Sequence, residues 1–241
     1  MQFQFRFPGW RALVLAAGWV MSQPAASLSF EDTMAQRLIA CTACHGPQGR
    51  AAADGYYPRL AGKPAGYLYN QLLNFRDGHR AYPLMTQMVD PLSEAYLLEI
   101  AEYFAALDVP YPAPTPVQAT PAQRQRGEQL ALRGDASRQL PACAACHGAA
   151  LTGVLPATPG LLGLPRDYLN AQLGAWRTGL RQAHAPDCMA DVAKRLAPED
   201  IAAVSAWLAS RPVPAQAHAV RPDASPLPMH CGSALPPGAQ R

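Results

Sequence analysis

Apolar side chains recur three and four positions apart along most of the chain, which is the spacing of helices that bury one face. The pattern is clearest in Tyr67–Arg76 and Tyr168–Arg177, each followed within two residues by a glycine, as helices often are. Ser93 precedes an acidic turn, as an N-cap residue does. Further helices are expected at 34–41, 124–133 and 198–209. No run of alternating apolar and polar residues indicates a strand, so the sequence predicts an all-α fold.

The same helical unit occurs twice. P-R-L-A-G at 58–62 precedes Y-L-Y-N-Q-L-L-N-F-R-D-G-H-R at 67–80, and P-G-L-L-G at 159–163 precedes Y-L-N-A-Q-L-G-A-W-R-T-G-L-R at 168–181. Tyr, Leu, Gln, Leu, an aromatic residue, Arg, Gly and Arg recur in the same order at a constant offset. The sequence therefore predicts a tandem duplication.

Proline clusters mark the joints between these units. The chain has 25 prolines in 241 residues, concentrated between the two units and after Arg211. Such segments favour extended linkers and disordered tails over packed core. The expected organisation is a signal peptide at 1–27, a first domain at 28–110, a linker at 111–122, a second domain at 123–210 and a disordered tail at 211–241.

The first 27 residues have the composition of an export signal. Arg6 and Arg11 precede the apolar run A-L-V-L-A-A-G-W-V-M, and small residues suited to cleavage follow. An uncleaved anchor is the alternative, but the run is short for a bilayer and contains Gly18. We therefore expect a periplasmic protein that meets membranes only through its partners. Without the two arginines the net charge of +3 falls to about +1, so the chain lacks the basic surface that nucleic acid requires.

The candidate chemistry lies in C-T-A-C-H and C-A-A-C-H, one in each unit. Each motif offers only three ligands, whereas structural zinc takes four. A thioredoxin-like dithiol needs a surrounding sheet, which the pattern does not predict. The remaining interpretation is covalent haem attachment, in which both thiols form thioethers and the histidine binds the iron. The expected cofactors are two haem c groups, held by Cys41, Cys44 and His45 and by Cys143, Cys146 and His147.

The sixth iron ligand is expected to be methionine. Met85 lies eight residues before Ser93, and Met189 lies eight before Ala197, the matching position in the second unit. Met88 has no methionine counterpart, so we expect it in the core. His79 and His184 are the alternative ligands, but they do not align with each other and would otherwise be surface or loop residues. Methionine opposite histidine raises the reduction potential of the iron.

The repeats also suggest what surrounds the haem. The carbonyls of Pro58 and Pro159, at matching places, are candidates to accept the second N–H of the ligating imidazoles, with ordinary turn prolines as the alternative. The aromatic residues of the repeat are expected in the core, with contact to the haem as an additional role: Tyr67, Phe75, Tyr103, Tyr168, Trp176 and Trp207. Four arginines are candidates to pair with haem propionates, although for each one we expect the solvated surface: Arg76, Arg80, Arg177 and Arg181.

With these residues in place, the chain resembles the cytochrome c4 family of two-haem class I cytochromes c. The resemblance runs from about Met34 to Ser210 and includes C-T-A-C-H-G, C-A-A-C-H-G, P-R-L-A-G, Q-L-x-x-F-R-x-G-x-R, M-T-Q-M-V-D-P-L-S and R-G-D-A-S-R-Q-L-P-A-C. It implies two tandem all-helical cytochrome domains, each wrapped around one haem, and His/Met ligation through Met85 and Met189. It also implies a periplasmic electron carrier rather than an enzyme.

Cys188 and the tail containing Cys231 depart from the family pattern. In an oxidising compartment these two remaining cysteines would tend to pair, with two free thiols as the alternative. The expected function is single-electron transfer from a respiratory donor to an acceptor such as a terminal oxidase. The expected partners are an oxidase, a quinol-oxidising complex or a dehydrogenase. The alternatives are a dihaem peroxidase, which needs an iron with a displaceable ligand, and a dedicated cytochrome subunit of a periplasmic dehydrogenase.

Overall fold

The fold is that of a computed structural model, which describes residues 2, 31–52, 54–114, 116–223 and 226–234. The chain divides into two units, Met1–Asp32 and Thr33–Arg241, and the fold below belongs to the second. The predicted signal peptide lies outside the described residues except for residue 2. Among the helices of the described ranges, none is both long and apolar enough to cross a bilayer.

The first repeat is built from helices around a single apolar core. Leu97 and Phe104 are almost completely buried where α5 packs against α3. The Ser93 hydroxyl accepts a hydrogen bond from the backbone N–H of Tyr96, so the N-cap expected there begins α5. The elements are α1 (Met34–Arg37), α2 (Ile39–His45), η1 (Pro47–Gly49), α3 (Ala65–Arg76), α4 (Pro83–Val89) and α5 (Glu94–Ala106).

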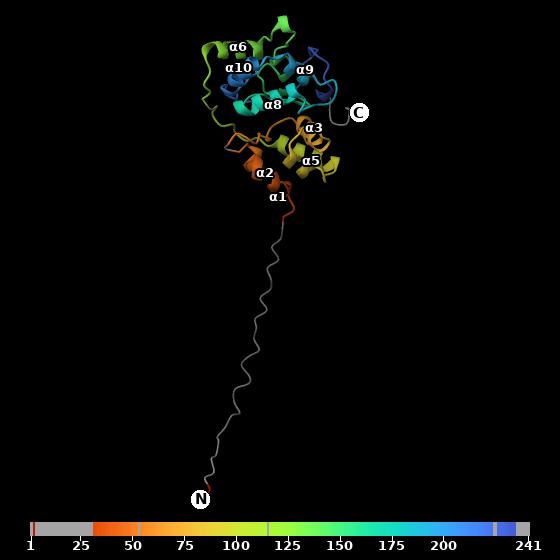
Figure 1. Cartoon of the computed structure of the whole chain (residues 1–241). Coiled ribbons are helices and arrows are strands. Elements are labelled where there is room, and N and C mark those ends of the chain that lie inside the picture. Colours follow the sequence, from red (N-terminus) through yellow and green to blue (C-terminus); the bar gives the residue numbers. More distant parts are fainter. Residues whose placement is uncertain (1, 3–30, 53, 115, 224–225, 235–241) are drawn as a thin grey trace. The chain divides into compact units, whose positions relative to one another are not determined.

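The second repeat has its own core, in which α10 packs against α6 and α8 (Figure 1). Trp207 and Leu208 of α10 are buried there. The elements are α6 (Pro121–Leu132), η2 (Ala136–Arg138), α7 (Ala144–His147), β1 (Gly153–Val154), β2 (Thr158–Pro159), α8 (Arg166–Thr178), α9 (Cys188–Arg195) and α10 (Pro198–Ala209). The predicted all-α class is confirmed.

Two local features differ from the predictions. The described part of the second repeat contains a short antiparallel hairpin, in which Gly153 pairs with Pro159 and Val154 with Thr158. Strands of two residues are too short to produce a readable alternation. In addition, α6 begins at Pro121, before the expected domain boundary at residue 123, because Thr120 and Gln123 form a capping box.

The two repeats meet at a junction built by equivalent residues. Arg80 and Arg181 pair as an antiparallel backbone bridge. The Arg80 guanidinium donates to the side-chain oxygens of Gln71 and Gln172, at 3.0 and 2.7 Å, and Arg181 donates to the same two oxygens, both at 2.7 Å. Arg181 is only 3% exposed. The expectation that Arg80 and Arg181 lie on the solvated surface was wrong, because each is held by the glutamines of both repeats.

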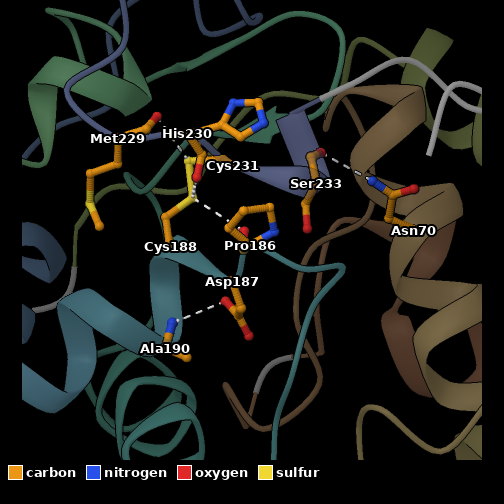
Figure 2. Close-up of a disulfide and its surroundings, with 9 residues drawn as sticks. All are labelled: Asn70, Pro186, Asp187, Cys188, Ala190, Met229, His230, Cys231 and Ser233. Atoms are coloured by element: carbon orange, nitrogen blue, oxygen red, sulfur yellow. Dashed lines mark hydrogen bonds between the residues drawn. A yellow bond between two sulfur atoms is a disulfide. The ribbon is translucent and has the colours of Figure 1, made fainter. Parts of the chain in front are cut away.

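The proline-rich tail contacts both repeats over its described residues, which differs from the disorder expected for 211–241. Val220 pairs with β1, donating to the Gly153 carbonyl at 3.0 Å and accepting from the N–H of Leu155 at 2.8 Å. Further on, Cys231 forms a disulfide with Cys188 at the start of α9. Figure 2 shows this disulfide and the neighbouring hydrogen bond, 3.3 Å long, from the Asn70 amide of α3 to the Ser233 carbonyl of η3 (Gly232–Ala234).

Candidate haem sites

Each C-x-x-C-H motif lies on a short helix that ends at its histidine. In α2, Cys41 is half-buried and Cys44 exposed, while the histidine that follows is buried. Cys143 is the residue before α7, and Cys146 lies within it. None of these four thiols is in a disulfide. Two residues three positions apart share one side of a helix, so each pair presents both sulfurs to one ligand.

The thiols lack the electrostatics of a redox dithiol. Burial raises the pKa of Cys41 and Cys146, and it raises the pKa of Cys143 to about 11. Reactive cysteines in C-x-x-C oxidoreductases have a lowered pKa instead, because the thiolate is the attacking species. In addition, no cluster of three metal-binding side chains occurs in the part of the chain that the structure describes. Covalent attachment of a ligand remains the use that fits both pairs.

The two imidazoles are buried and oriented in the same way. Nδ1 of His45 lies 2.8 Å from the Pro58 carbonyl oxygen, and Nδ1 of His147 lies 2.7 Å from that of Pro159. A carbonyl only accepts, so Nδ1 carries the proton and Nε2 keeps its lone pair for a metal. Burial lowers the pKa of both histidines, which favours the neutral, ligating form. The roles of Pro58 and Pro159 toward iron remain predictions.

A glycine reverses the chain directly after each histidine. Gly46 has φ 76° and Gly148 has φ 83°, in the region that L-residues with side chains rarely adopt. A Cβ on Gly46 would lie 2.2 Å from the Ala51 carbonyl oxygen. The glycine that ends C-T-A-C-H-G therefore lets the following loop return beneath the histidine and bring the proline carbonyl to Nδ1.

The candidate methionine ligands lie on equivalent helices. Met85 is in α4 and packs against the first core, and Met189 is half-buried in α9, next to the disulfide-bonded Cys188. Ser93 and Ala197, from which the register was counted, are the N-caps of α5 and α10. Met88 is 43% exposed, so its expected place in the core was wrong. Ligation by Met85 and Met189 remains a prediction.

The alternative ligands, His79 and His184, lie near each other at the junction. Both are half-buried, and their ring centroids are 6.1 Å apart. The backbone carbonyl of His79 accepts a hydrogen bond from the N–H of Gln182 at 2.7 Å, which places this loop in the contact between the repeats. Both rings thus lie in the contact between the repeats, where Nε2 of His184 is buried without a hydrogen-bond partner.

Buried polar atoms show whether these residues fit haem. Trp176 Nε1 of α8 is buried without a hydrogen-bond partner, and so are the side-chain oxygens of Asn70 and Asn74 of α3. Buried polar groups are normally paired, so an unpaired indole N–H calls for an acceptor such as a haem propionate. Together with the oriented imidazoles and the free thiols, this atom indicates that the residues fit the cofactor. Sequence reasoning treated Trp176 as core and missed its polar atom.

Fold and site together define a c-type cytochrome, and comparison with known proteins agrees. The family model "Cytochrome c" matches residues 125–212. The chain is 41% identical over 174 residues to the thiosulfate dehydrogenase electron acceptor of Thiomonas intermedia, covering 72% of this chain and 79% of the relative. The crystal structure of Pseudomonas stutzeri cytochrome c4 matches with TM-score 0.63 and 32% identity, over 73% of this chain and 95% of that one.

The chain belongs to the cytochrome c4 family of dihaem cytochromes. It is an electron carrier with two covalently bound haem c groups. It is also similar to part of a longer chain, the thiosulfate dehydrogenase TsdBA of Marichromatium purpuratum. That match has TM-score 0.63 and 35% identity over 71% of this chain, and it spans 36% of the TsdBA chain.

Proposed function

We propose that this cytochrome accepts electrons from a thiosulfate-oxidising dehydrogenase and passes them to a respiratory acceptor such as a terminal oxidase. The observation that carries the proposal is the 41% identity to an electron acceptor of thiosulfate dehydrogenase over most of both chains. The similarity to one part of the thiosulfate dehydrogenase TsdBA also supports it. The periplasm is the proposed location.

The bound haem groups supply one-electron chemistry, and the side chains prepare the sites for it. His45 and His147, fixed by the carbonyls of Pro58 and Pro159, are the proposed proximal iron ligands. Met85 and Met189 are the proposed distal ligands, with four cysteines as the covalent attachment: Cys41, Cys44, Cys143 and Cys146. With a histidine and a methionine bound, each iron would have no open position for a substrate, as an electron carrier requires.

A surface of the first repeat has the character of a docking site for the donor. Cys44 is exposed there. The ring centroid of Tyr57 lies 6.0 Å from that of His45 and 5.0 Å from that of Tyr56, which in turn lies 6.2 Å from that of Tyr82. Tyr56 is 60% exposed, and Leu84 and Met88, four residues apart on α4, are 56% and 43% exposed. Aromatic residues and methionine are enriched in protein interfaces, so an exposed group of such side chains near His45 suits contact with a redox partner.

The proposal is tested by mixing the oxidised holoprotein with thiosulfate and a catalytic amount of a purified thiosulfate dehydrogenase. Reduction of both haems is expected with the enzyme, and none with thiosulfate alone. The Leu84→Ser variant should slow reduction several-fold. Leu227→Ser is the control and should not, because Leu227 is similarly exposed but lies in the tail. Failure of the enzyme to reduce the wild-type protein would refute this donor.

The peroxidase alternative is separated by the ferric absorption spectrum. Two low-spin haems and no turnover of hydrogen peroxide are expected of a carrier. A high-spin haem together with peroxide turnover would replace the carrier proposal with the enzyme.

A further inference from the structure

A buried lysine crosses from the first repeat into the haem site of the second. Lys63 precedes α3 and is only 4% exposed. Its Nζ donates a hydrogen bond, 2.9 Å long, to the carbonyl oxygen of Gly160 in the second repeat. The chain has one other lysine, Lys194, which is exposed on α9. An ammonium group in such a position needs an explanation, because lysines are almost never fully buried.

The hydrogen-bond acceptor of Lys63 adjoins the support of a proposed iron ligand. Gly160 follows Pro159, whose carbonyl accepts the hydrogen bond from Nδ1 of His147. The Lys63 ammonium is therefore held at the backbone residue next to the carbonyl that orients the His147 imidazole. The charge of Lys63 therefore acts on the second site.

Comparison of the repeats shows that packing alone does not require a lysine here. P-R-L-A-G-K-P in the first repeat aligns with P-G-L-L-G-L-P in the second, so Lys63 corresponds to Leu164. Leu164 packs against the second apolar core. Gly160, the acceptor, corresponds to Arg59, and a Cβ there would lie 2.5 Å from the Thr152 carbonyl oxygen. An uncharged side chain thus serves at the matching position, whereas a buried cation carries a desolvation cost.

We propose that the positive charge of Lys63, a residue of the first repeat, raises the reduction potential of the haem in the second repeat. A nearby positive charge disfavours the oxidised iron, which carries one more positive charge than the reduced iron. In the low-dielectric interior the effect is screened less than at the surface. An electron that enters at the first haem is then more stable on the second. The inference rests on electron carriage, not on the identity of the donor.

The charge of Lys63 can be removed by raising the pH within a range that the protein can be measured in. Burial lowers the pKa of Lys63 to about 8, and the charge of Arg59 in the same loop adds to the shift. Other titratable or charged groups near this loop are His147 of α7, Tyr111, on which Arg59 stacks at 3.8 Å, and His218, beside Gly62. Asp108, 3.4 Å from His218, and Arg50 also act on Arg59. Because only the protonated lysine repels the oxidised site, the potential of the second haem should fall as the pH rises through about 8.

The test is a redox titration of the holoprotein, followed by absorption spectra, for the wild type and for Lys63→Gln, Lys63→Arg and Lys194→Gln. Gln keeps a donor for Gly160 but removes the charge, and Arg keeps the charge. We expect Lys63→Gln to lower one of the two potentials by about 59 mV, a tenfold change in the ratio of reduced to oxidised haem, and to abolish its fall near pH 8. NMR of the haem methyl groups assigns that potential to the second haem.

Two of these variants, Lys63→Arg and Lys194→Gln, are the controls. Lys194→Gln removes the same charge at the surface and should leave both potentials close to wild type, as should Lys63→Arg. Unchanged potentials in Lys63→Gln, or an equal shift of both haems, would overturn the proposal. Helical circular dichroism and the haem content show that each variant is folded. Failure of the protein to accept electrons from a thiosulfate dehydrogenase would leave this result unaffected.

Discussion

At the scale of single residues, the two sites share one solution for holding a histidine. A glycine with positive φ follows the imidazole, the loop returns, and a proline carbonyl accepts a hydrogen bond from the Nδ1–H. Proline suits this place because it has no N–H of its own and a fixed φ. The imidazole is thus set in one tautomer before any metal binds, which reduces the reorganisation that ligation requires.

The methionine assignment gives a test at this scale. Met85→Ala and Met189→Ala should each remove about half of the Met–iron charge-transfer absorption of the oxidised protein. Each should also lower the potential of one haem, because methionine opposite histidine raises it. Absorption spectra and a redox titration provide both measurements.

Met88→Ala is the matched control for these variants, since Met88 lies in the same helix as Met85 but is 43% exposed. It should leave the band intact. If both test variants kept the full band, another methionine would be the ligand. If the wild type lacked the band, His79 and His184 would be examined next.

At the scale of elements, ion pairs fix the segment that leads into the second motif. Asp200, at the start of α10, accepts hydrogen bonds from Arg126 of α6 at 2.7 Å and from Arg138 of η2. Arg126 also reaches Asp135, at 2.8 Å. Asp200 is 5% exposed. Ion pairs therefore hold the segment G-D-A-S-R-Q-L-P (134–141), which leads into the second motif, against α6 and α10.

Replacing Asp200 by Asn should lower the free energy of unfolding by about 2 kcal/mol at pH 7, because two arginines lose their charged partner. Burial acts to raise the pKa of Asp200, but hydrogen bonds from Arg126, the backbone N–H of Ala197 and Arg138 outweigh it, so the pKa is lowered. The stabilisation is then complete above the unfolded-state pKa of about 3.9 and is lost as the pH falls further.

Urea unfolding between pH 3 and pH 7 measures this difference. The gap between wild type and Asp200→Asn should shrink as the solution is acidified below about pH 4. Glu199→Gln, an exposed neighbour in the same turn, should change little at any pH. A gap that persisted unchanged at pH 3 would show that the carboxylate charge is not responsible.

Sequence reasoning identified the elements better than their contacts. Helical spacing and the Ser93 cap located the helices because these signals are local to the chain. The start of α6 was missed although Thr120 and Gln123 spell a capping box. The burial of Arg181 and Lys63 depends on partners about a hundred residues away, Gln71 and Gly160, so no local pattern reveals it. The C-x-x-C-H sites were readable because their chemistry lies in five consecutive residues.

At the scale of the whole folded unit, the repeats are coupled by reciprocal contacts. Gln71 and Gln172 each accept hydrogen bonds from both junction arginines, so each glutamine holds an arginine of its own repeat and one of the other. The arginine side chains also cover aromatic rings, with Arg181 3.7 Å from the ring centroid of Trp176. Duplication thus supplied both halves of the interface at once.

The tail adds a second connection to the folded unit, the disulfide between Cys188 and Cys231, and a substitution can remove it. Cys231→Ser opens a loop with a sequence separation of 43 residues, and loop-closure entropy assigns about 4 kcal/mol to a crosslink of that length. We expect a lower melting temperature, and faster amide exchange in α9 and in the described tail near η3. Thermal unfolding with and without a reductant, followed by hydrogen exchange, measures both.

Wild-type protein in the reductant should match Cys231→Ser, and the variant should not respond to the reductant. The haem spectrum serves as the internal control for an intact second site. An unchanged melting temperature would show that the tail contacts hold without the crosslink.

The disulfide between Cys188 and Cys231 has a consequence for how the protein matures. In an oxidising compartment such as the proposed periplasm, six cysteines can be joined into three disulfides in fifteen ways, and each of these uses the four thiols that haem attachment requires. Once thioethers have formed at both motifs, a single pairing is left. Haem attachment, in which each thiol adds to a vinyl group without oxidation, then keeps these four cysteines out of disulfides. Whether it precedes the oxidation of Cys188 and Cys231 determines the yield of correctly assembled protein.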